Sequence, residues 1–115
     1  MPANLSQGNG QYSLLSTAGT YTLNQGQQAG LAANPGVYYG LNITALGTTP
    51  LAVVLDIIPP RGTSTATTTN TIAIHTGTAQ GQSFNGGIPG VGVRYQGALA
   101  IVWTGTAASA VALWD

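Results

Sequence analysis

The chain has 115 residues, carries charge on only 3% of them, and contains no cysteine, no lysine and no glutamate. A typical soluble domain is about 25% charged, so this composition excludes a basic surface for nucleic acid, disulfide bonds and thiolate metal sites. The length fits one domain with one modest hydrophobic core.

We expect residues 11–115 to form that single domain and residues 1–10 to form a flexible, polar N-terminal arm. The arm has neither the basic region nor the apolar run of a secretory signal, which predicts a protein made in the cytoplasm. The longest apolar run, residues 50–60, is interrupted by Asp56 and is too short to span a bilayer. No membrane partner is therefore expected.

The N-terminal half is divided by Gly and Pro into segments that alternate with the period of two typical of β-strands. Gln11–Leu15 and residues 20–23 are expected to be short strands. Residues 37–46 have the clearest alternation, which predicts one apolar face made of Val37, Tyr39, Leu41, Ile43 and Ala45.

Residues 51–58 are apolar on both faces, because Leu51, Val53 and Leu55 alternate with Ala52, Val54 and Asp56, and Pro59 and Pro60 end the segment. The buried Asp56 carboxylate would need a partner. Arg61, Arg94 or a residue of a neighbouring chain could supply it, and a solvent-facing Asp56 on an edge strand is the alternative.

Residues 63–71 form a threonine-rich stretch that is interpreted as an exposed loop or edge strand, with an ice-binding array as a distant alternative. Thr71–Thr76 is expected to be a short strand with His75 on the solvent side, opposite Ile72 and Ile74. Residues 77–90 are predicted to form a long loop that could contact a partner. Arg94 and Tyr95 then lie on the next strand.

The C-terminal segment, residues 97–114, is expected to be a hairpin that turns at residues 105–108. In this hairpin Trp103 would face Ala110 and Ile101 would face Ala112, so that large side chains meet small ones. The opposite face is also apolar, with Ala100, Val102, Val111 and Leu113. Trp103, Trp114, Leu99 and Ile101 are the expected core residues.

About eight short strands and no helix predict an all-β protein, an antiparallel β-sandwich of jelly-roll or Greek-key-like topology. A sandwich buries only one face of each sheet, so strands that are apolar on both faces predict that a neighbour covers the second face. The chain also lacks the charged residues that usually protect sheet edges. These features favour a homo-oligomer.

Catalysis is not expected, because the titratable inventory is limited to His75, Asp56, Asp115 and a few tyrosines. A Ser-His-Asp arrangement with His75 and Asp56 is formally possible, but no G-x-S-x-G nucleophile elbow is present. One His and two Asp cannot form a four-ligand zinc site within one chain, although His75 side chains could surround an oligomer axis. We predict no catalytic, cofactor or metal site.

Three segments near the C-terminus carry a resemblance: residues 92–97 (GVRYQG), 102–106 (VWTGT) and 111–114 (VALW). They resemble the C-terminal hairpin of small virion structural proteins of tailed bacteriophages. The composition of the remaining chain is also similar to that of these proteins. The resemblance implies a head decoration (cement) protein, a head fibre or a small tail component, located in the virion. Decoration proteins are commonly trimers seated where subunits of the major capsid protein meet. The resemblance therefore implies two kinds of partner, further copies of this chain and the major capsid protein or other virion proteins.

The sequence thus supports two functional hypotheses. The first is a non-enzymatic structural protein of a phage particle, with preference for one that decorates and stabilises the capsid through oligomeric β-sheet and apolar contacts. The second is a module that binds carbohydrate or a host surface, with Tyr38, Tyr39, Tyr95 and the loop at residues 77–90 supplying stacking and hydrogen bonds.

Overall fold

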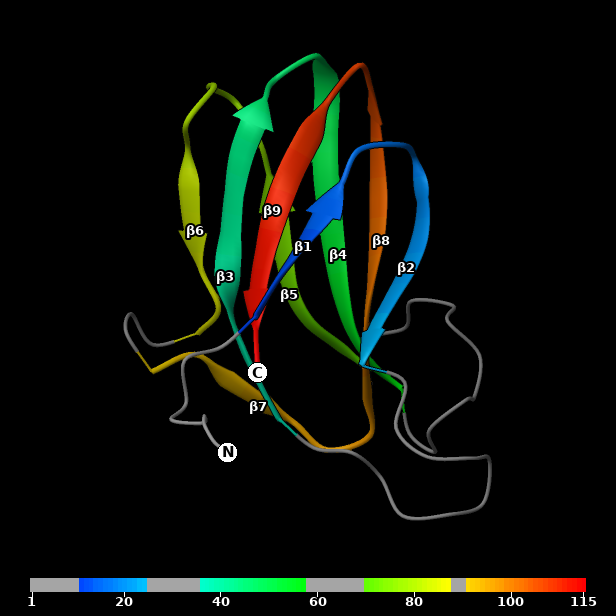
Figure 1. Cartoon of the computed structure of the whole chain (residues 1–115), viewed down its shortest axis with the longest axis vertical. Coiled ribbons are helices and arrows are strands. Elements are labelled where there is room, and N and C mark those ends of the chain that lie inside the picture. Colours follow the sequence, from blue (N-terminus) through cyan, green and yellow to red (C-terminus); the bar gives the residue numbers. More distant parts are fainter. Residues whose placement is uncertain (1–10, 25–35, 58–69, 88–90) are drawn as a thin grey trace.

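The computed structural model describes residues 11–24, 36–57, 70–87 and 91–115, which form two antiparallel sheets packed face to face (Figure 1). No helix occurs in these ranges. The nine strands, in chain order, are β1 (Gln11–Leu15), β2 (Gly19–Asn24), β3 (Gly36–Ala45), β4 (Thr48–Ile57), β5 (Thr71–Thr76), β6 (Ser83–Asn85), β7 (Val93–Tyr95), β8 (Ala98–Thr106) and β9 (Ser109–Trp114).

The strand order is that of a jelly roll. Sheet A has the order β1-β9-β3-β6, with β7 also paired to β3, and sheet B has the order β2-β8-β4-β5. Strands from the two ends of the chain pair first, β1 with β9 and β2 with β8, and the pairing then continues inward to β4 with β5. This wrapping of one long antiparallel ribbon defines the jelly roll. The expected antiparallel β-sandwich is confirmed.

The predicted loop at residues 77–90 contains a strand, which was missed. Residues 83–85 form β6, which pairs with β3 through Leu41 and Phe84. Only Phe84 faces inward from so short a strand, and Gly and Gln surround it. Alternation over three residues is too short a signal to identify from sequence.

The predicted apolar face of β3 is wrong in its first half. Tyr38 is fully buried together with Leu41 and Ile43, whereas Val37 and Tyr39 are only half-buried. The register against β9 shifts between Tyr38 and Gly40, which indicates a β-bulge. A bulge adds one residue to one strand, so the side-chain alternation changes phase there. The alternating pattern is therefore correct only from Leu41 onward.

The predicted C-terminal hairpin is also wrong. β8 pairs with β2 and β4 in sheet B, whereas β9 pairs with β1 and β3 in sheet A. Figure 1 shows the chain crossing at one end of the sandwich from β8 (orange) to β9 (red). Ala107 in this connection has a φ of 55°, in the left-handed region. The large side chains of β8 and the small side chains of β9 still share one core, but they come from different sheets and are not ladder partners.

The main core lies between the sheets and includes Leu99, Ile101, Trp103 and Trp114, as predicted. A second buried cluster lies on the outer face of sheet B, where β4 contributes Leu55 and Ile57. Both faces of β4 are therefore apolar, as predicted, and part of its second face is already buried within the chain. The second cluster also includes Ala98 and Ala100, with Val53 and Val102 packed against it.

Several predictions fall on residues that lie outside the described ranges. They concern the arm at residues 1–10, most of the threonine-rich stretch, and Arg61 as a partner for Asp56. Within the described ranges, no helix is long and apolar enough to cross a membrane.

Candidate functional site

The outer face of sheet A carries exposed apolar side chains at its β1 edge. Tyr12 and Leu14 are 71% and 62% exposed. Their register partners on β9 are Leu113 and Val111, both half-buried. We call these four residues the apolar stripe. Exposed apolar groups that form a contiguous patch usually mark a surface that contacts another molecule.

The surroundings of the apolar stripe are polar but almost uncharged. Across β9 and β3 the same face continues with Asn42, Thr44 and Ser109, and the hydroxyls of Thr44 and Ser109 lie 2.7 Å apart in a hydrogen bond. Asp115 and Arg94, which flank Val37 beyond the stripe, are exposed and of opposite sign. The stripe therefore offers apolar contact and hydrogen bonding, with no net charge to attract a charged partner.

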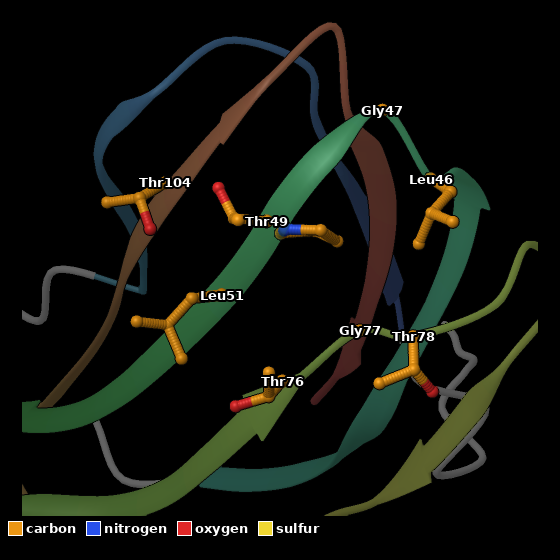
Figure 2. A pocket seen from close by; sticks show the side chains of 9 residues that line it. Leu46, Gly47, Thr49, Leu51, Thr76, Gly77, Thr78 and Thr104 are labelled. Carbon is orange, nitrogen blue, oxygen red and sulfur yellow. The ribbon is translucent and has the colours of Figure 1, made fainter.

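A pocket of about 660 Å³ opens at the end of the sandwich where β3 turns into β4 (Figure 2). Figure 2 shows Leu51, Thr76 and Thr104 on three neighbouring strands of sheet B. Thr49 has a φ of 47°, which is unusual for a β-branched residue and is the kind of strain often found at ligand sites. The lining is uncharged and consists of Leu46, Gly47, Thr49, Pro50, Leu51, Thr76, Gly77, Thr78 and Thr104.

His75 was predicted to face solvent, and this prediction is wrong. The side chain is only 7% exposed, whereas Ile74 is 63% exposed. The imidazole stacks on Phe84 at 4.8 Å and on Tyr38 at 5.9 Å between ring centroids. Its Nε2 atom has no hydrogen-bond partner among the described residues, and burial lowers the pKa of the ring. His75 is a neutral core residue.

Asp56 is buried at 7% exposure, and backbone amides hold its carboxylate. The N–H of Gln96 donates to Oδ2 at 2.8 Å, and the N–H of Gly97 donates to Oδ1 at 2.7 Å. The predicted pairing of Asp56 with Arg94 is wrong, because within the described ranges Arg94 is exposed on β7 and forms no ion pair with the buried Asp56 carboxylate. The solvent-facing alternative is wrong as well. Asp56 fixes the turn that leads into β8.

His75 and Asp56 do not come together. His75 pairs with Ala52 in the β4–β5 ladder, and Asp56 lies four residues further along β4, about 13 Å away at about 3.3 Å per residue. Among the residues that the structure describes, no group of three or more His, Cys, Asp or Glu side chains could hold a metal ion.

The tyrosines proposed for glycan stacking are mostly inside the molecule. Tyr38 and Tyr95 are fully buried, and burial raises the pKa of Tyr38. The hydroxyl of Tyr95 donates to the Asp115 carbonyl oxygen at 2.8 Å. Sequence reasoning missed Tyr12, whose exposure depends on where β1 lies.

Comparison of the chain with protein families, curated proteins and solved structures gives no match.

Proposed function

We propose that this chain is a non-enzymatic structural protein of a bacteriophage particle that works by self-association and stabilises the head as a decoration protein. The observation that carries the proposal is the apolar stripe, because Tyr12 and Leu14 keep most of their surface in solvent. Burial of such exposed apolar surface against another protein is favourable, because it removes apolar groups from water.

Three further features support the proposal. Jelly rolls are widely used in viral capsid and lectin domains. The surroundings of the stripe are almost uncharged, so the electrostatic repulsion that keeps soluble proteins apart is weak. The resemblance of residues 92–97, 102–106 and 111–114 to small phage virion proteins points to a particle, and a trimer is the state that it implies.

The first test is the native mass of the purified chain, measured by light scattering after size exclusion over a concentration series. We expect a mass well above the 11.5 kDa of one chain. Mass spectrometry of purified particles of the phage that encodes the chain should then detect it in the virion. A monomer at every concentration, or its absence from those particles, would contradict the proposal.

A second candidate function is the binding of a neutral glycan, and the pocket at the β3–β4 turn favours it. The pocket combines apolar walls with threonine hydroxyls and has no charged group. Ligand pockets are usually apolar with a few placed polar groups, and the volume lies in their range. The pocket replaces the buried Tyr38 and Tyr95 as the place where a sugar would bind.

A glycan screen followed by two variants tests this candidate. Thr76→Val and Thr104→Val keep the shape of the side chain and remove the hydroxyl, and each should weaken binding about tenfold if that hydroxyl bonds the sugar. Thr20→Val is the matched control, because Thr20 is an exposed strand threonine outside the pocket. Equal binding by all three variants would exclude the pocket.

A further inference from the structure

We infer that two copies of this chain pair through β1, antiparallel and about a two-fold axis at Ser13, so that Tyr12 of each copy lies opposite Leu14 of the other. The inference rests on the proposed self-association and names the surface that carries it. It forms one sheet that runs from sheet A of one copy into sheet A of the next.

The first argument is the open side of β1. In the described part of the chain, β1 pairs with β9 on one side and ends sheet A on the other. A sheet edge presents unpaired backbone N–H and C=O groups that can add a further strand. β1 lacks three of the usual protections, since it contains no charge and no proline, and its register against β9 has no bulge.

The second argument is that β1 is held in a conformation ready to pair. The indole Nε1 of Trp114 donates to the Ser13 hydroxyl at 3.0 Å. Beyond the strand, the Tyr21 hydroxyl accepts from the Thr17 amide at 3.0 Å and donates to the Thr17 carbonyl at 2.8 Å. A fixed strand loses little conformational entropy when it pairs, which favours association.

The third argument is the register. β1 has five residues, and all five find a partner in a second β1 only when Ser13 lies at the centre. Tyr12 then faces the partner's Leu14, and residues that face each other in an antiparallel pair lie on the same side of the sheet. The two apolar stripes therefore join into one continuous surface across the axis.

The size of the stripe favours edge pairing over contact between faces. Four partly exposed side chains offer on the order of 300 Å² per copy, at the low end for an interface patch. Two such patches fall short of the roughly 1,200 Å² that a stable interface buries. In edge pairing the two stripes lie side by side, so only the Tyr12–Leu14 contacts across the axis are buried, and the backbone hydrogen bonds along β1 supply most of the binding energy.

A second copy is the occupant that fits this surface. The stripe has no charge with which to select a charged partner, and in a two-fold contact each copy presents the same surface to the other. A trimer would need a head-to-tail contact between two different surfaces. The β1 edge therefore favours a pair of chains over the trimer implied by the phage resemblance.

The test uses two single variants and their mixture. Tyr12→Lys and Leu14→Glu each place an unpaired charge in the contact, and we expect each to weaken self-association at least about tenfold. In a mixture, the introduced lysine of one variant would lie opposite the introduced glutamate of the other, while the second Leu14–Tyr12 pair stays native. Mixing should therefore restore the pair of chains. Ile74→Lys, at an equally exposed position on β5, is the control and should leave the mass unchanged.

Light scattering of these samples beside the wild type separates the outcomes, with circular dichroism to show that each variant is folded. Loss of the dimer in both variants and its return on mixing would support the inference. An oligomeric wild type that Tyr12→Lys and Leu14→Glu leave intact would overturn the β1 contact and leave self-association standing. A monomeric wild type would contradict both the β1 contact and the proposed self-association. Loss without return on mixing would overturn the register centred on Ser13.

Discussion

The imidazole of His75 lies in the sandwich core between the rings of Phe84 and Tyr38. Of the groups that face it, Tyr38 on β3 is the titratable one, and its raised pKa keeps it neutral. Phe84 on β6 and Ala52 on β4 carry no charge. A protonated His75 would have no anion beside it, so burial lowers its pKa from 6.5 and the folded chain holds the neutral ring.

We predict that the free energy of unfolding falls as the pH drops below 6.5, the ordinary pKa of histidine. Below that pH His75 binds a proton in the unfolded chain but stays neutral in the folded chain. The free energy of unfolding therefore falls by up to about 1.4 kcal/mol per pH unit. Above it both states are neutral and this contribution is constant. Denaturant titrations between about pH 5 and about pH 8 measure the slope.

His75→Phe is the matched variant, because phenylalanine keeps the ring stack and cannot be protonated. The chain has one histidine, so this variant should lose the slope in that pH range. The same slope in both proteins would show that His75 is not its origin.

The orientation of His75 also shows where sequence reasoning fails for a single residue. Alternation correctly places Ile74 and His75 on opposite faces of β5, but hydrophobicity favours burial of Ile74. The β4–β5 register shifts between Val54 and Leu55, which leaves Ile72 as an extra residue on β5. Ile72 and Ala73 both pack against the core, so the phase of the alternation changes and His75 enters the core. A bulge depends on the neighbouring strand and has no local signal here.

At the scale of elements, Asp56 connects β4 to the turn that leads into β8. Its two carboxylate oxygens accept hydrogen bonds from the amides of Gln96 and Gly97. These amides lie between strands of different sheets, β7 in sheet A and β8 in sheet B. Asp56 therefore helps to hold the chain where it crosses the sandwich.

Asp56→Asn should lower the free energy of unfolding by about 2 kcal/mol, because the new amide NH₂ replaces an acceptor and leaves one backbone N–H unpaired. Urea denaturation measures the change. The control is Asp115→Asn, since the Asp115 side chain is exposed, and its effect should stay within about 0.5 kcal/mol. Equal stability of the two variants would show that the Asp56 hydrogen bonds contribute little.

The sequence predicts only half of the apolar stripe, the part that lies on β9. The sequence indicates that Val111 and Leu113 form an apolar face opposite the core, and they do lie on the outer side of β9. Tyr12 and Leu14 join that face only because β1, almost a hundred residues earlier in the chain, pairs with β9. Pairs so distant in sequence follow from topology, which alternation along one strand does not encode.

At the scale of the whole molecule, almost no charge reaches the surface. Of the four charged side chains, Asp56 is buried, Arg94 and Asp115 are exposed, and Arg61 lies outside the described ranges. The proposed association between copies would therefore depend on apolar contact and hydrogen bonds. Neither is screened by salt in the way that ion pairs are.

We predict that the dissociation constant of the self-associated protein changes less than about twofold between about 0.05 M and about 0.5 M NaCl. Sedimentation velocity over a concentration series at each salt level measures it. Sulfate should tighten the association, because it strengthens the burial of apolar surface. Dissociation at high NaCl would instead indicate that charged groups carry the contact.

The all-β class, the position of most strands and the nearly uncharged character of the surface can be predicted from the amino-acid sequence alone. These features are local, since strand alternation, Gly and Pro positions and composition do not depend on distant residues. Three features become apparent only in the folded chain: β8 and β9 lie in different sheets, bulges turn Tyr38 and His75 into the core, and Tyr12 stays outside. Each of these depends on which strand lies alongside, and in a jelly roll that strand is usually distant in sequence.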